Sequence, residues 1–172
     1  MLIYFPIFDL STKVLDNYVK LFQEKPFVYV NGYTNSLVMM AKHCIERKIV
    51  IKEICPTLQS VVTTSEVCDS IDRKILEEGF GVKIINEYGA SELDIIAFED
   101  VNGDWLINYE TLYIEILNDE NKMVTSGEEG RVVVTSLYNK AMPFIRYDLG
   151  DRVIIKDKMK GNYQILDTVV GR

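Results

Sequence analysis

The sequence predicts an α/β fold in which a parallel-rich sheet flanked by helices is followed by a small antiparallel β subdomain. Helical and strand patterns alternate over the first half of the chain, which is typical of parallel sheets with crossover helices. In the second half, short strand patterns are separated by turn residues, which favours antiparallel hairpins. The chain has 172 residues, of which 48% are hydrophobic and 26% charged, so it can bury a core.

The first half is expected to hold three helices and three strands. A helix capped by Asp9 or Ser11 runs to about Glu24, before Pro26, and a second helix follows the turn at 31–36. A third spans 69–78, with Gly79 at its end. The apolar positions of the first and third helices are Leu10, Val14, Leu15, Tyr18, Val19, Phe22, Ile71, Ile75 and Leu76. Strands are expected at 27–30, 59–63 and 82–86.

The second half is expected to form strands at 94–98, 113–117, 130–136, 151–155 and 163–166. Turn residues such as Asn102 and Gly103 lie between them. The switch from one pattern to the other gives an α/β subdomain at residues 1–107 and an antiparallel subdomain at residues 108–172.

Charge and cysteine usage exclude several functions. A net charge of -7 disfavours nucleic acid as a partner, because an acidic surface repels phosphate backbones. The cysteines Cys44, Cys55 and Cys68 form no C-x-x-C pair, so buried, reduced thiols are expected. His43 and Cys44 are adjacent on a helix and face different ways, which disfavours a metal pair. Without a basic leader or a membrane-length apolar run, a cytoplasmic protein with no membrane partner is expected.

The segment at 86–92 carries the first candidate site, because it follows a buried strand of an α/β sheet. Gly89 lets the backbone turn tightly. Tyr88 offers a flat face for a base, Ser91 a hydroxyl for a phosphate oxygen, and Glu92 a hard oxygen for Mg²⁺. The alternative is a strand-to-loop turn with a solvated glutamate.

The segment at 141–151 carries the second candidate site. Arg146 and Asp151 bracket a short loop that turns at Gly150. A carboxylate at the start of a strand can accept hydrogen bonds from two vicinal hydroxyls, as a ribose offers. The alternative is a salt bridge from Arg146 to Asp148 or Asp151 that holds the loop.

Taken together, the two segments resemble adenylate-forming (AMP-binding) enzymes. Tyr88-Gly89-Ala90-Ser91-Glu92 is similar to their Tyr-Gly-x-Ser/Thr-Glu motif. Arg146-Tyr147-Asp148-Leu149-Gly150-Asp151 is similar to their Arg-Tyr-x-x-Gly-Asp motif, and the intervening 130–137 resembles their Gly-Glu-Leu-Val-x-Thr strand. The final Gly171-Arg172 resembles the Gly-Arg that opens the hinge to their C-terminal domain. The turn at 31–37 resembles the Gly-Tyr-Pro-Ser turn of the phenylacetate–CoA ligase-like branch, which includes capsule-biosynthesis (CapK-like) members.

The resemblance implies a role for each matching residue. Tyr88 and Gly89 would lie at the adenine, Ser91 at the α-phosphate and Asp151 at the ribose hydroxyls. Glu92 would bind Mg²⁺, and Ser91 and Glu92 would be the catalytic pair. Arg172 would approach the ribose and phosphate, and Ser65 and Glu66 would lie beside the adenine, although the glycine and proline usual in that turn are absent. The implied cofactors are ATP or AMP, Mg²⁺ and CoA, and the substrate is a small-molecule carboxylate.

The upstream Ser/Thr/Gly-rich phosphate loop and the C-terminal lysine domain of these enzymes have no counterpart in the sequence. We therefore expect an internal fragment of a carboxylate–CoA ligase that is inactive alone. The alternatives are one subunit of a split ligase and a non-catalytic nucleotide-binding or interaction remnant. Apolar residues at Phe5, Phe8 and Phe27 are expected to be exposed and to favour a homo-oligomer or a partner chain that supplies missing segments.

Overall fold

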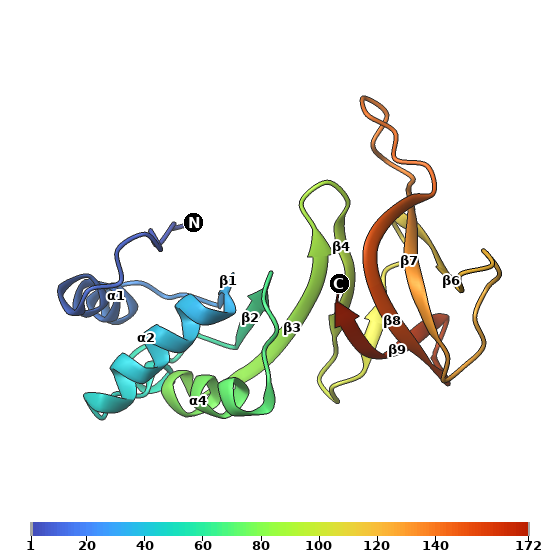
Figure 1. Ribbon diagram of the computed structural model, residues 1–172. Coiled ribbons are helices and arrows are strands. Elements are labelled where there is room, and N and C mark those ends of the chain that lie inside the picture. Colours follow the sequence, from blue (N-terminus) through green and yellow to red (C-terminus); the bar gives the residue numbers. More distant parts are fainter. Residues whose placement is uncertain (1, 172) are drawn as a thin grey trace. The chain divides into compact units, whose positions relative to one another are not determined.

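The computed structural model describes residues 2–171 (Figure 1). Helices and strands alternate first and strands alone follow, which confirms the predicted α/β class. Two compact units meet between Asn86 and Glu87. This point lies before residue 107, where the sequence placed the boundary. The reason is that β4 (Asp94–Glu99) and β5 (Trp105–Ile107) pair antiparallel with each other, and β5 also pairs with β9 (Tyr163–Gly171), so both belong with the later strands.

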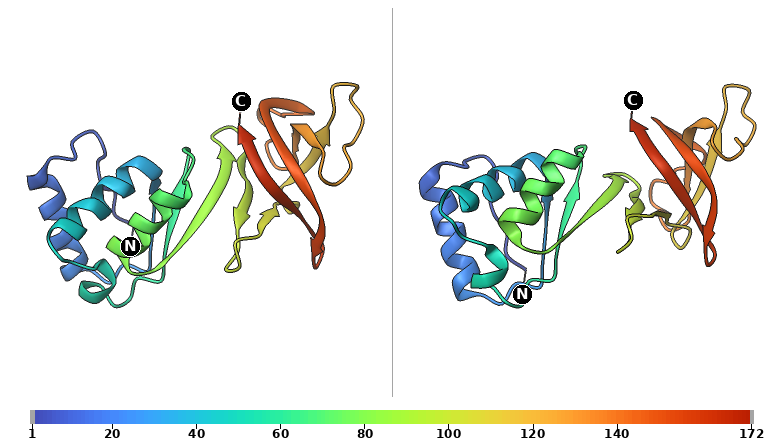
Figure 2. Two further views of the ribbon diagram at one scale, coloured as in Figure 1. Left: turned by 60° about the horizontal axis from the view of Figure 1, so that its bottom comes forward. Right: turned by 90° about the horizontal axis from the view of Figure 1, so that it is seen from below.

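The first unit is a short parallel sheet with its helices on one face (Figure 2). Its strands run in the order β1-β2-β3, and both pairings are parallel. Alternate residues such as Val61 and Ile84 are buried and share one core with the helices. The elements are α1 (Thr12–Glu24), β1 (Tyr29–Tyr33), α2 (Thr34–Glu46), α3 (Ile51–Ile54), β2 (Ser60–Thr64), α4 (Ser70–Phe80) and β3 (Lys83–Ala90).

Helix α4 shows how local sequence sets the ends of an element. The Asp69 carboxylate accepts hydrogen bonds from the backbone amides of Ile71 and Asp72, at 2.7 and 2.8 Å, and so caps the first turn. The helix ends at Phe80, and the capping residue Gly81 adopts the left-handed conformation with φ 69°. The sequence placed this end at Gly79 and pointed Ile71 inward; both predictions are wrong. Ile71 is exposed.

Gly79 instead lies inside α4, where α2 approaches it. A Cβ at this position would lie 2.7 Å from the Cα of Ala41 and 2.8 Å from its carbonyl oxygen. A glycine and an alanine therefore let the two helix backbones pack closely. An interior glycine weakens a helix, and the close packing against Ala41 offsets this effect here.

The aromatic residues near the start of the chain pack together. Phe5 lies edge-on to Tyr18 with ring centroids 4.8 Å apart, and Phe22 and Phe27 lie 4.9 Å apart. These contacts join the first core, so the expected exposure of Phe5 and Phe27 is wrong. Phe8 is fully exposed, as expected.

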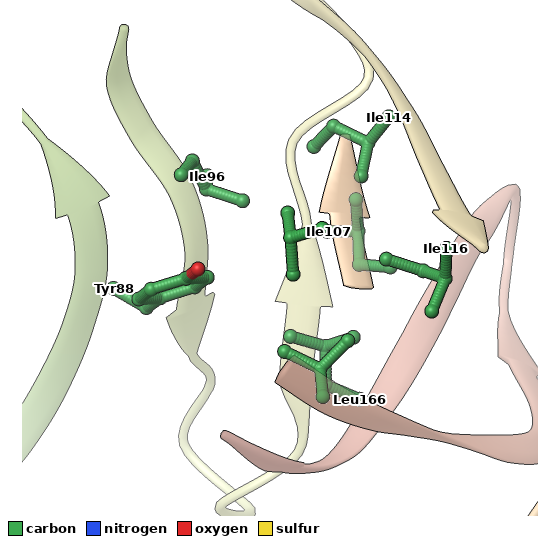
Figure 3. A pocket seen from close by; sticks show the side chains of 8 residues that line it. Tyr88, Ile96, Ile107, Ile114, Ile116 and Leu166 are labelled. Carbon is green, nitrogen blue, oxygen red and sulfur yellow. The ribbon is translucent and has the colours of Figure 1, made fainter. Parts of the chain in front are cut away.

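The second unit is an antiparallel sheet. It comprises the later part of β3, then β4, β5, β6 (Leu112–Leu117), β7 (Glu129–Ser136), β8 (Tyr147–Lys160) and β9. Their hydrogen-bonded order is β3-β4-β5-β9-β8-β7-β6, and each pairing is antiparallel. Every one of these strands contributes a side chain to one apolar interior, and the sheet curls around it. The lining residues are Tyr88, Ile96, Ile107, Ile114, Ile116, Val132, Val153 and Leu166 (Figure 3).

The three cysteines are buried or half-buried and form no disulfide with one another. Cys44 and Cys55 are buried, and Cys68 is half-buried. Burial raises the pKa of the Cys44 thiol to about 11, which keeps it protonated and unreactive. Over residues 2–171, no helix is both long enough and apolar enough to span a membrane.

Candidate functional site

The first motif forms the end of β3 and the turn into β4. The backbone amide of Leu93 donates to the carbonyl of Ala90 at 3.0 Å, which closes a tight turn with Ser91 and Glu92 exposed at its tip. Behind the turn, the two strands come unusually close. A Cβ on Gly89 would lie 2.8 Å from the carbonyl oxygen of Asp94, so the motif needs glycine at this position.

The second motif lies where β8 departs from regular pairing. Arg152 of β8 lies opposite Arg131 of β7, and Asp148 lies opposite Val133. One residue of β7 therefore faces three residues of β8, and β8 bulges at the segment that contains Asp151. The strand thus begins before Asp151, at Tyr147, and not at Asp151 as the sequence suggested.

Gly150 is the residue that makes this bulge possible. Its φ of 77° lies in the left-handed region, which costs other residues about 1–2 kcal/mol. Its backbone amide donates to the Asp148 carboxylate at 3.0 Å, which fixes the turn from within. Asp151 follows directly, and its side chain is half-buried.

Arg146 holds the loop differently from either pairing weighed above. Its Nε donates to Oε2 of Glu115 on β6 at 3.0 Å, and its backbone amide donates to Oγ1 of Thr135 at 2.9 Å. Asp148 pairs with Arg131 on β7. The alternative of a salt bridge from Arg146 to Asp148 or Asp151 is therefore wrong, because the antiparallel ladder brings an acid from a neighbouring strand closer.

The two motifs meet through a reciprocal pair of tyrosine–carboxylate hydrogen bonds. The Tyr88 hydroxyl, from the first motif, donates to Oδ2 of Asp151 in the second, at 2.9 Å. The Tyr147 hydroxyl, from the second motif, donates to Oε1 of Glu92 in the first, at 3.1 Å. All four residues belong to the second unit. The structure therefore brings together three of the predicted site residues, Tyr88, Glu92 and Asp151.

Tyr88 has an apolar and a polar end. Its ring is half-buried and packs against the interior cluster that Ile96, Ile107 and Leu166 help to form (Figure 3). The space between these side chains is too small for a water molecule. The hydroxyl at the other end of the ring reaches Asp151.

Glu66 has a structural role in the first unit that the sequence did not suggest. Helix α2 begins after Tyr33, whose side chain makes no capping hydrogen bond. The Glu66 carboxylate takes that place, accepting from the backbone amide of Asn35 at 2.7 Å and from its side-chain amide at 2.8 Å. Neighbouring Ser65 adopts a left-handed φ of 68°. Arg172 lies outside the described residues.

Tyr147 is a functional candidate for which sequence reasoning assigned no role. Its place inside the Arg-Tyr-x-x-Gly-Asp motif was the available clue in the sequence. Its partner Glu92 lies 55 residues away, so the motif alone does not reveal the contact. Within residues 2–171, no three or more His, Cys, Asp or Glu side chains gather closely enough to hold a metal ion.

Comparison with known proteins found one relative that aligns with most of the chain. No family model matches the chain. It is 26% identical over 143 residues to Protein CapK of Staphylococcus aureus, an alignment that covers 83% of this chain and 30% of CapK. The chain thus spans less than a third of that relative.

Solved structures of CoA ligases share the fold. An open conformation of 2-hydroxyisobutyryl-CoA ligase in complex with 2-HIB-AMP and CoA matches with a TM-score of 0.82 at 18% identity, over 97% of this chain and 41% of the ligase. The anthranilate CoA ligase AuaEII in complex with anthranoyl-AMP matches with a TM-score of 0.67 at 16% identity, over 92% of this chain and 33% of that one. The resemblance that the motifs predicted is confirmed: the chain has the fold of part of an adenylate-forming CoA ligase.

Proposed function

We propose that this chain is part of an ATP-dependent carboxylate–CoA ligase of the phenylacetate–CoA ligase-like kind, and that its second unit binds the AMP portion of the nucleotide. One observation carries the proposal. Two motifs far apart in sequence are tied together by the bonds Tyr88–Asp151 and Tyr147–Glu92. Fold similarity to ligases solved with acyl-AMP compounds supports it.

The residues present suit a nucleoside monophosphate. A carboxylate can accept about four hydrogen bonds, so Asp151 can bind a ribose diol while it accepts from the Tyr88 hydroxyl. Ser91 lies exposed at the tip of its turn, where its hydroxyl can donate to a phosphate oxygen. A net charge of -7 opposes additional phosphates, so AMP should bind at least as tightly as ATP.

Glu92 also fits the role of a Mg²⁺ ligand that depends on the nucleotide. Its exposed carboxylate has one oxygen oriented by Tyr147. Mg²⁺ in nucleotide enzymes is often held by one or two carboxylates together with substrate phosphates. When bound, the ion would neutralise phosphate charge. Because no group of three acidic or imidazole ligands surrounds Glu92 within the described residues, Mg²⁺ should add little to AMP binding.

In the reaction of the complete ligase, a carboxylate oxygen of the substrate attacks the α-phosphorus of ATP and pyrophosphate leaves. A thiol such as that of CoA then attacks the acyl carbon, and AMP leaves. In this chain, Asp151 and Ser91 would hold the ribose and α-phosphate in place for both steps. The 172 residues contain no Ser/Thr/Gly-rich phosphate loop, so we expect binding without turnover.

An NMR titration of the ¹⁵N-labelled chain with AMP and with ATP tests the proposal. AMP should shift the amides of Tyr88, Ser91 and Asp151 with a Kd on the order of millimolar, because the binding surface is open to water. Asp151→Ala should weaken binding at least about tenfold. The matched control is Asp167→Ala, which removes a half-exposed carboxylate of β9 that pairs with Lys156.

Two outcomes would contradict the proposal. If ATP bound more tightly than AMP, phosphate-binding groups would exist elsewhere on the chain. If shifts were confined to surfaces away from both motifs, the chain would be an interaction remnant and not part of a nucleotide site.

A further inference from the structure

The resemblance gives Tyr88 the task of contacting the adenine, but the structure shows its hydroxyl bound to the residue meant for the ribose. The Tyr88 hydroxyl donates to Oδ2 of Asp151 at 2.9 Å across 63 residues of sequence. The ring packs against the core of the second unit. Tyr88 is thus anchored at one end by apolar contacts and holds a carboxylate at the other.

We propose that Tyr88 is a positioning residue for ribose recognition: its hydroxyl fixes the Asp151 carboxylate in the orientation that accepts both ribose hydroxyls. This inference rests on the proposed nucleotide site and adds the source of its specificity. On this inference Tyr88 affects nucleotide binding through the ribose, whether or not its ring also contacts the base.

The backbone that carries Asp151 is irregular. It follows Gly150, whose φ is 77°, in the bulged stretch of β8. A side chain on a bulge is less restrained by regular cross-strand neighbours than one in a regular ladder. A hydrogen bond from a rigid donor restricts rotation of the carboxylate before a ligand binds. The carboxylate then loses less conformational freedom when it binds a diol.

Tyr88 is a suitable rigid donor. Its ring contributes to the apolar interior together with Ile96, Ile107 and Leu166, from three other strands (Figure 3). The packing of the ring against these side chains restrains it on that side. The core of the unit therefore helps to place the hydroxyl, and the hydroxyl helps to orient Asp151.

A carboxylate has more hydrogen-bonding positions than one hydroxyl occupies. The Tyr88 hydroxyl donates to Oδ2 of Asp151, and an ionised carboxylate offers about four lone-pair positions in all. Two vicinal hydroxyls can reach both oxygens of one carboxylate. The ligand class is thus a ribonucleoside monophosphate, and a nucleotide without the 2′ and 3′ hydroxyls should lose this contact.

Tyr88→Phe tests the inference, because it removes the hydroxyl and keeps the ring. Affinities for AMP and for 2′,3′-dideoxy-AMP are measured by NMR titration of the full chain. The wild type should prefer AMP, and Tyr88→Phe should reduce this preference by about three- to tenfold through weaker AMP binding alone. A loss of ring stacking would instead weaken both ligands equally.

Tyr109→Phe is the matched control. Tyr109 also packs against the second core and donates its hydroxyl to Gln164 at 2.9 Å, away from both motifs. It should leave the AMP preference unchanged. An equal effect of both variants would mean that loss of any half-buried hydroxyl loosens the unit, and would overturn the positioning role.

A thermal-melting cycle without ligand tests the contact itself. Tyr88→Phe, Asp151→Ala and the double variant are compared with the wild type. The Tm losses should be non-additive, because the hydrogen bond between Tyr88 and Asp151 can be lost only once. Additive losses would overturn the inference.

The outcomes separate this inference from the proposed function. If the wild type prefers AMP and Tyr88→Phe keeps the full preference, the positioning role is wrong and the nucleotide site stands. If the wild type shows no preference for AMP, the ribose site itself fails, and the role of Tyr88 fails with it.

Discussion

Replacing Gly89 by alanine tests whether a close backbone approach shapes the turn that carries Ser91 and Glu92. The added Cβ would lie 2.8 Å from the carbonyl oxygen of Asp94 and 3.4 Å from its carbonyl carbon. Both atoms are backbone, so the strands must separate to admit the methyl group. Overpacking of this kind costs about 1–3 kcal/mol. In a chain of this size each kcal/mol lowers Tm by about 2–4 °C, so a fall of roughly 2–12 °C is expected.

Differential scanning calorimetry measures this loss, and NMR shows where it acts. The control is Gly32→Ala, a glycine in β1 whose added Cβ would lie 3.4 Å from the flexible side chain of Leu37. That variant should melt near the wild-type temperature. In Gly89→Ala, amide shifts should concentrate at Ser91, Glu92 and the start of β4. A Gly89→Ala protein as stable as the wild type, with an unmoved turn, would refute the steric argument.

Two further predictions concern the first unit. Burial raises the pKa of Asp16, but the hydrogen bond from His43 and the charge of Arg47 outweigh this and hold the pKa of the carboxyl below its usual value. Asp16 therefore stabilises the fold above the unfolded pKa near 3.9 and loses this effect as the pH falls through the lower folded pKa. Asp16→Asn should lower Tm at pH 7, and this difference should shrink as the pH falls below the unfolded pKa through the lower folded pKa; a constant difference in Tm would contradict this. Glu66→Ala should destabilise the chain by about 0.5–2 kcal/mol through loss of the α2 cap, and should leave AMP affinity unchanged. A loss of affinity without a loss of stability would restore Glu66 to the nucleotide site.

Local sequence predicted most of the elements but not all of their ends. Helix α1 and strands β2, β4 and β7 lie close to where periodicity placed them. The end of α4 was misplaced because Gly79 and Gly81 are both candidates for a helix end. Only the packing of Ala41 against α4 shows that Gly79 is needed inside the helix. The three-residue strand β5 is too short to show a period, and its pairing with β4 and β9 defines it.

The candidate site was predicted as a set of residues but not as an arrangement. The two motifs identified Tyr88, Ser91, Glu92 and Asp151 from residue type and order. Their mutual hydrogen bonds depend on the bulge in β8 and on the curl of the sheet, which are properties of strand pairing and not of either motif.

The helix cap provided by Glu66 was missed for a similar reason. Capping side chains are usually sought at the first residue of the helix or just before it. Tyr33 occupies that place and makes no capping hydrogen bond, so the carboxylate comes from Glu66, which lies 31 residues beyond the Asn35 amide that it accepts from. An uncapped helix start in a sequence is thus a reason to look for a remote acid.

Intermolecular nuclear Overhauser effects in the AMP-saturated chain test the central claim most directly, because they locate the nucleotide on the protein. The account predicts contacts from the ribose H2′ and H3′ protons to Asp151 and from AMP protons to the Tyr88 ring, both in the second unit. Contacts confined to residues outside the two motifs would contradict it.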